Sequence, residues 1–259
     1  MSDRVALVTG GSRGIGREIC FALAARGYAV VVAARTEVDA SKTAEFRRYA
    51  AGTIHDTTRM ITDGGGRAAG IRCDLTRAED IRDLVAAALD RFGRIDVLVS
   101  NAGVDCESPL TELDVEVLDH CLAVNVRAPA LLCKYALPGM IARHSGSIIG
   151  ITSGAARGYR PGRVGYSMSK AALDRMLLSL AEEVRPWGIA VNALSPGRID
   201  TWMNRRGDWP GTEHVPLEQP EIVGPAVVWL AEQTAATFTG QVVARADFGV
   251  GWGPAATRT

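Results

Sequence analysis

The fold is decided by the first turn of the chain, which reads Val5-Ala6-Leu7-Val8-Thr9-Gly10-Gly11-Ser12-Arg13-Gly14-Ile15-Gly16. Its first four residues are apolar on both faces, as in a strand buried within a parallel sheet. Residues 17–26 then carry the pattern of an amphipathic helix that stops at Gly27. Glycines between the two allow the backbone to approach a ligand, and a helix N-terminus offers free N–H groups to an anionic pyrophosphate. An ordinary glycine-rich loop is the alternative, but a turn placed after the first strand favours a dinucleotide site.

Apolar runs alternate with helical patterns through the rest of the chain. The sequence predicts strands at 29–34, 68–72, 95–100, 147–151 and 189–194, with a weaker one at 241–243. Helical patterns lie between them, near 78–92, 114–138, 165–185 and 220–232. This alternation predicts a Rossmann-type α/β fold with a doubly wound parallel sheet. No linker divides the chain, so we expect a single NAD(P)-binding oxidoreductase domain over residues 1–259.

Composition excludes several classes of protein. Lys plus Arg and Asp plus Glu each number 29, so no basic excess points to nucleic acid. No apolar run approaches the ~20 residues that span a bilayer, and the first turn comes too early for a signal peptide. We therefore expect a cytoplasmic protein that binds neither membrane nor nucleic acid. The five cysteines lack CxxC spacing and the four histidines are scattered, so we predict neither a metal site nor a disulfide framework.

The end of the second predicted strand bears on the choice of dinucleotide. NAD enzymes usually carry an acid there for the ribose 2′-hydroxyl, whereas an arginine accommodates a 2′-phosphate. This chain has Arg35 at that point, no acid before Glu37, and a second cation, Arg13, in the glycine turn. We predict that NADP(H) is preferred over NAD(H). The alternative is that Arg35 only solvates a strand end.

A tyrosine and a lysine open the strongest helical pattern. Tyr166 and Lys170 are four residues apart and so share one helix face. A free tyrosine has a pKa of about 10, and a nearby lysine charge is expected to lower it towards the range of a useful acid–base group. Ser153 follows the strand at 147–151, where a parallel sheet places catalytic groups. Such a pair is common by chance in helices, and only its combination with the glycine turn and the serine indicates an enzyme site.

With these motifs in order from about Val5 to Gly240, the chain resembles the short-chain dehydrogenase/reductase family, in its compact single-domain branch. The resemblance rests on the glycine turn and on Asp74-Leu75, Asn101-Ala102-Gly103, Asn125, Ser153, Tyr166, Lys170, Pro196-Gly197, Ile199 and Thr201. It implies that Tyr166 is the general acid and base, that Lys170 binds the nicotinamide ribose, and that Ser153 orients the substrate. Asn125 would hold a water of the proton relay. The implied cofactor contacts are Gly10, Ser12, Arg13, Gly14, Ile15, Gly16, Arg35, Asp74, Leu75, Asn101, Ala102, Gly103, Tyr166, Lys170, Pro196, Gly197, Ile199 and Thr201.

The resemblance also implies a small-molecule carbonyl or alcohol substrate and a homodimer or homotetramer. A non-catalytic NADP(H)-binding sensor on the same fold is the alternative, although it would not need Tyr166 or Lys170. An epimerase or dehydratase is a third possibility, usually with a larger C-terminal part.

Other residues suggest how the substrate is handled. Trp202, Met203, Trp209 and Pro210 fall where the family places a mobile lid, and Arg157, Arg160 and Arg163 are candidates for attracting an anionic substrate. Cys106 is expected to pack rather than react. The chain departs from the family in its long 36–66 segment, predicted as two short helices or a surface excursion, and in the run 246–251.

Overall fold

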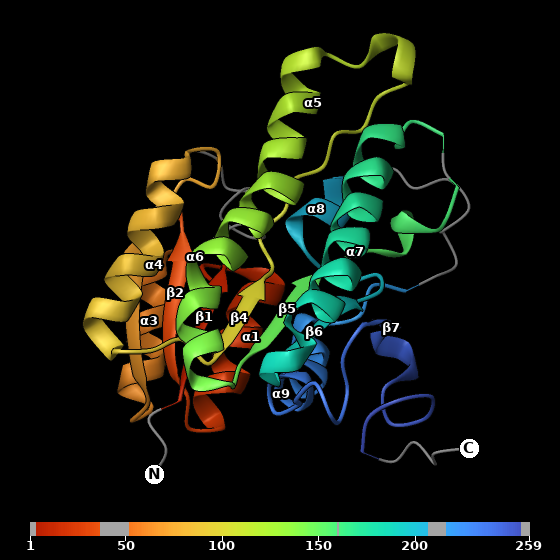
Figure 1. Cartoon of the computed structure of the whole chain (residues 1–259). Coiled ribbons are helices and arrows are strands. Elements are labelled where there is room, and N and C mark those ends of the chain that lie inside the picture. Colours follow the sequence, from red (N-terminus) through yellow and green to blue (C-terminus); the bar gives the residue numbers. More distant parts are fainter. Residues whose placement is uncertain (1–3, 37–51, 160, 207–215, 255–259) are drawn as a thin grey trace.

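A computed structural model describes residues 4–36, 52–159, 161–206 and 216–254. Within these ranges one parallel sheet has the strand order β3-β2-β1-β4-β5-β6-β7 (Figure 1). The chain builds outward from β1 to β3, crosses back to β4, and then builds to β7. The Rossmann-type doubly wound fold predicted from the sequence is confirmed. The strands are β1 (Val5–Thr9), β2 (Ala29–Ala34), β3 (Arg67–Arg72), β4 (Val97–Ser100), β5 (Ser147–Ile151), β6 (Ala190–Ser195) and β7 (Gln241–Ala244).

Helices cover both faces of the sheet. Alternate side chains of each strand point to opposite faces, so Leu7 packs into one core and Val8 into the other. The core on one face is completed by α4 (Ala78–Phe92), α6 (Ala128–Arg143) and α7 (Val164–Val184). The opposite core is completed by α1 (Gly14–Ala25), α3 (Ile54–Asp63) and α9 (Gly224–Ala231). Central strands buried on both faces explain the unbroken apolar runs of the sequence.

Several element boundaries differ from the sequence-based prediction. Helix α1 begins at Gly14 instead of residue 17, inside the glycine turn. The single helix predicted over 114–138 consists of α5 (Val115–Leu122), a π-helical turn (Ala123–Arg127) and α6. A π turn inserts one extra residue into a helix. The apolar pattern of the sequence changes too little for this insertion to be predicted.

The long segment after β2 is described only in its second half. Helix α3 begins after a capping box in which Thr53 and Asp56 satisfy each other's backbone N–H groups. The first half of the predicted excursion, residues 37–51, lies outside the described residues. No helix in the described part of the chain has the length and hydropathy to cross a membrane.

Candidate active site

A cleft of about 980 Å³ opens at the carboxyl ends of the strands. Its walls come from the loops after β1, β2, β3, β4, β5 and β6, so residues far apart in sequence meet there. The strand order reverses between β1 and β4, and the carboxyl edge at such a switch point is where α/β sheets bind ligands.

Most residues that the sequence analysis singled out line this cleft. They are Gly10, Ser12, Arg13, Gly14, Ile15, Gly16, Arg35, Asp74, Leu75, Asn101, Ala102, Gly103, Ser153, Tyr166, Lys170, Pro196, Gly197 and Thr201. Of the predicted catalytic and cofactor-binding residues, Asn125 and Ile199 do not line the cleft.

Gly10 and Gly16 of the glycine turn are packed so tightly that neither position has room for a side chain. A Cβ at Gly16 would lie 2.2 Å from the Gly10 carbonyl oxygen and 2.4 Å from Asn101 Nδ2. Gly10 and Gly14 have φ values of +69° and +52°, which side-chain-bearing residues rarely adopt. Bare backbone at the start of α1 therefore faces the cleft, and this arrangement fits a pyrophosphate group.

Thr9 connects the glycine turn to the loop after β4. Its hydroxyl oxygen accepts hydrogen bonds from the N–H groups of Asn101 and Ala102, at 3.1 and 3.2 Å. In return, Asn101 Nδ2 donates to the Thr9 carbonyl oxygen at 2.8 Å. These bonds hold the Asn101-Ala102-Gly103 segment against the turn.

Replacing Thr9 with valine is expected to lower the free energy of unfolding by about 2 kcal/mol, because two backbone N–H groups lose their acceptor. Thermal and urea denaturation would measure the change. Thr58→Val is the matched control, since the buried Thr58 hydroxyl has no hydrogen-bond partner among the described residues. Equal stabilities of the two variants would contradict this assignment.

Two arginines and an aspartate line the cleft near the ends of β1, β2 and β3. Arg35 is exposed and Arg13 half-buried, and both line it. Asp74 Oδ1 accepts hydrogen bonds from the backbone N–H and the hydroxyl of Thr76, at 3.0 and 2.8 Å. Burial raises the pKa of Asp74, but these bonds and the charge of Arg35 outweigh it and lower the pKa overall. Glu37 lies outside the described residues.

Ser153, Tyr166 and Lys170 come together at the end of the cleft near β5 and α7. Lys170 Nζ donates to the Ile151 carbonyl oxygen at 3.0 Å and lies 5.8 Å from the centroid of the Tyr166 ring. Burial lowers the pKa of Lys170 to about 8. Ser153 Oγ accepts from the Ala155 N–H at 3.2 Å.

The expectation that the pKa of Tyr166 is lowered is wrong for the protein by itself. Burial, followed by the negative charge of Asp105, raises the pKa of this phenol to about 12. A hydrogen bond with Ser153 and the charge of Arg163 act in the opposite direction but do not compensate. Removing the phenolate from water costs more than these favourable contacts return.

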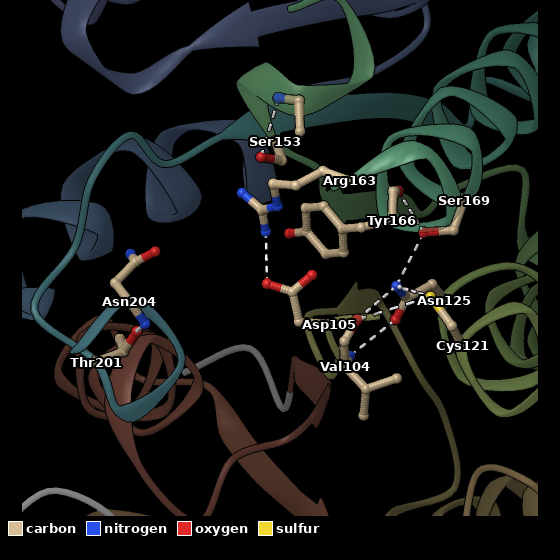
Figure 2. A network of polar contacts seen from close by, with 11 residues as sticks. Val104, Asp105, Cys121, Asn125, Ser153, Arg163, Tyr166, Ser169, Thr201 and Asn204 are labelled. Carbon is tan, nitrogen blue, oxygen red and sulfur yellow. Dashed lines mark hydrogen bonds and ion pairs between the residues drawn. The ribbon is translucent and has the colours of Figure 1, made fainter. Parts of the chain in front are cut away.

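Asn125 lies behind the cleft wall, in the π-helical turn (Figure 2). Its Oδ1 accepts from the Val104 N–H at 2.9 Å, and its Nδ2 donates to the Val104 carbonyl oxygen at 2.9 Å and to Ser169 Oγ at 3.0 Å. The amide therefore holds the loop after β4 against α7. Ile199 is fully buried and pairs with Glu218 in an isolated bridge.

An ion pair that the sequence analysis missed also borders the cleft. Arg163 Nη2 donates to Asp105 Oδ2 at 2.5 Å, and the guanidinium carbon of Arg163 lies 4.4 Å from the centroid of the Tyr166 ring (Figure 2). Asp105 belongs to no motif, so the sequence carries no signal for it. Arg157, a second arginine proposed to attract an anionic substrate, is exposed and does not line the cleft. The third, Arg160, lies outside the described residues.

The predicted lid is described in part. Trp202 and Met203 begin α8 (Trp202–Arg206) and line the cleft, whereas Trp209 and Pro210 lie outside the described residues. Cys106 also borders the cleft, but it is buried, and burial together with Cys121 raises the pKa of its thiol to about 12. It therefore stays a neutral thiol, which fits the expected packing role.

A doubly wound parallel sheet with a polar cleft at its switch point defines a Rossmann-type nucleotide-binding architecture. Comparison with known proteins identifies the family. The family model of short chain dehydrogenases matches residues 4–209. The chain is also similar to a 3-oxoacyl-[acyl-carrier-protein] reductase of Synechocystis sp., with 35% identity over 248 residues, 93% of this chain and 94% of the relative. The chain belongs to the short-chain dehydrogenase/reductase family of oxidoreductases.

Solved structures are similar over most of the chain. A blue fluorescent protein from a metagenomic library, in complex with NADPH, has a TM-score of 0.80 and 31% identity, covering 93% of this chain and 95% of that one. A metagenomic short-chain oxidoreductase in complex with NADP has a TM-score of 0.74 and 32% identity, covering 93% and 96%.

Proposed function

We propose that this protein is an NADP(H)-dependent oxidoreductase that moves a hydride between the nicotinamide and a carbonyl or alcohol substrate. The observation that carries the proposal is that Ser153, Tyr166 and Lys170 share one cleft with the glycine turn. When bound, the dinucleotide supplies or accepts the hydride, and the protein supplies position and protons.

Tyr166 is the proposed proton donor in carbonyl reduction. Its hydroxyl would pass a proton to the substrate oxygen, and a pKa of about 12 keeps it protonated near neutral pH. Ser153 would hydrogen-bond the same oxygen. Lys170, held by the Ile151 carbonyl, would bind the nicotinamide ribose and favour the phenolate when the reaction runs towards alcohol oxidation. Asn125 would support a water of the proton relay from behind the cleft wall.

A preference for NADP(H) over NAD(H) is supported by the charges at the end of β2. Arg35 and Arg13 border the cleft there, and a ribose 2′-phosphate has oxygens that guanidinium groups bind well. The two solved structures also support this preference, since one is in complex with NADPH and the other with NADP.

Replacing Arg35 with alanine is expected to weaken NADPH binding about 10-fold or more, because a charge-assisted hydrogen bond to the 2′-phosphate is lost. NADH has no such phosphate, so its Kd should change by less than about threefold. Fluorescence titration of both nucleotides measures the two constants.

Arg72→Ala is the matched control for this substitution. Arg72 is exposed at the end of the neighbouring strand β3 and does not line the cleft, but its removal changes the net charge equally. Equal losses of NADPH affinity in both variants would mean that only the overall charge matters and would refute a specific role for Arg35.

We also propose a homodimer or homotetramer acting in the cytoplasm on a small-molecule substrate. The assembly is supported by apolar side chains that are exposed outside the cleft on the contacting helices α5 and α7, namely Val115, Val164 and Met168. Exposed apolar residues gathered on one surface are typical of contacts between subunits.

A further inference from the structure

The loop after β4 is fastened to the beginning of α7 directly beside the proposed catalytic tyrosine. Ser108 donates its backbone N–H to the Gly162 carbonyl oxygen at 2.8 Å. A Cβ at Gly165 would lie 2.7 Å from Cys106 Sγ, so the loop and the helix are in close contact. Asp105 and Arg163 add an ion pair to this junction, with 2.5 Å between Oδ2 and Nη2.

One partner of the ion pair, Arg163, covers the Tyr166 ring. The Arg163 guanidinium lies over the Tyr166 ring at 4.4 Å from its centroid, within the range of a cation–π contact. Arg163 is only 8% exposed, so solvent screens this contact weakly. Figure 2 shows the Asp105 carboxylate and the Arg163 guanidinium on either side of the space that the Tyr166 hydroxyl faces.

We infer that Asp105 and Arg163 are positioning residues for Tyr166: the arginine holds the ring, and the aspartate holds the arginine. The inference rests on the proposed function, in which Tyr166 is the general acid and base. It adds Asp105, which the sequence analysis did not identify, and gives Arg163 a role other than attracting an anionic substrate.

The charged and titratable groups around Tyr166 decide the sign of each effect. The negative charge of Asp105 raises the pKa of Tyr166, and the positive charge of Arg163 lowers it. The remaining neighbours are Ser153 after β5, Cys106 in the loop after β4, Cys121 on α5 and Lys170 on α7. All four residues are kept in every variant of the ion pair, although the charge of Asp105 also acts on Lys170 and Cys106.

The two partners therefore predict opposite shifts. Asp105→Asn removes a nearby negative charge and should lower the pKa of Tyr166. Arg163→Gln removes a nearby positive charge and should raise it. The double variant should lie between the two, whereas a merely structural role would displace the tyrosine in the same way in both single variants.

The test is a phenolate absorbance titration of each variant with saturating NADP⁺, whose positive ring should lower the pKa of the tyrosine. Subtracting the titration of Tyr166→Phe isolates Tyr166 from the other four tyrosines, since the chain has five. The pH dependence of kcat for oxidation of a secondary alcohol gives a second readout. The rising limb should move to lower pH in Asp105→Asn and to higher pH in Arg163→Gln.

Two further variants serve as controls. Arg163→Lys retains the positive charge, so the pKa of Tyr166 should stay closer to the wild-type value than in Arg163→Gln. It loses the planar guanidinium, so the Tyr166 ring should be held less firmly, and KM should rise or kcat should fall. Arg157→Gln removes an exposed cation from the same connection and should leave the titration unchanged.

Shifts in the same direction for both single variants, or none in either, would overturn the inference. If they occurred in a protein that still reduced carbonyl compounds, the proposed function would stand. Opposite shifts in a protein that turned over no carbonyl or alcohol would support the positioning role of the pair and contradict the proposed function.

Discussion

Replacing Tyr166 with phenylalanine is expected to lower the kcat for NADPH-dependent carbonyl reduction roughly 100- to 10,000-fold, the usual contribution of a general acid. The variant removes only the hydroxyl that faces the cleft, so the ring can still pack under Arg163. Steady-state rates of NADPH oxidation, measured with a ketone or aldehyde that the wild type reduces, give the change.

Tyr159→Phe is the control for this substitution. Tyr159 is 99% exposed, and loss of its hydroxyl should not affect the rate. NADPH affinity should also be unchanged in Tyr166→Phe, which separates loss of chemistry from loss of binding. A Tyr166→Phe rate within about threefold of the wild type would refute the role of this residue as proton donor.

Replacing Gly16 with alanine is expected to weaken NADPH binding by about 100-fold or more, because the backbone of the turn must move away from its position. The added methyl group would lie 2.2 Å from the Gly10 carbonyl oxygen and 2.4 Å from Asn101 Nδ2, and Asn101 cannot withdraw without disturbing its hydrogen bond to the Thr9 carbonyl oxygen. The free energy of unfolding should fall by on the order of 3 kcal/mol as well.

Gly64→Ala provides the control for the effect of an added methyl group. Gly64 has a φ of −78°, and its Cβ would be at an ordinary distance of 3.4 Å from the Met60 carbonyl oxygen. Nucleotide titration and urea denaturation of both variants give the comparison. Retention of wild-type NADPH affinity in Gly16→Ala would mean that the glycine turn does not hold the dinucleotide.

The strands were the most predictable part of the fold, for a physical reason. β1 and β5 are buried along their whole length, so the apolar run marks them without any periodic pattern. β7 lies at the sheet edge and is half-exposed, and its signal in the sequence was correspondingly weak. The π-helical turn at Ala123–Arg127 could not be predicted, because the residues on either side remain helical and apolar.

The candidate site was predictable where it consists of short motifs. The glycine turn, Ser153 and the Tyr166–Lys170 pair occupy one cleft as expected, since each follows a strand or opens a helix at the same edge of the sheet. Their roles as cofactor and catalytic contacts stay predictions that the proposed experiments test.

What escaped prediction depends on side-chain packing. Asp105 meets Arg163 across a distance of 58 positions in sequence, and no pattern in the chain links the two. The raised pKa of Tyr166 has the same origin: burial and Asp105 outweigh the hydrogen bond with Ser153 and the charge of Arg163, whereas the sequence pointed to Lys170. Asn125 and Ile199 were placed in the site by motif alone, whereas their surroundings put them behind its wall.

The most direct test of the central claim is a fluorescence titration of the purified wild-type protein with NADPH and, in parallel, with NADH. The account predicts saturable NADPH binding with a Kd at least about 10-fold lower than that for NADH, because Arg13 and Arg35 border the cleft where a 2′-phosphate would lie. Equal or tighter binding of NADH would contradict the proposed role of these arginines. Absence of binding by either nucleotide would contradict the assignment of the cleft as a dinucleotide site.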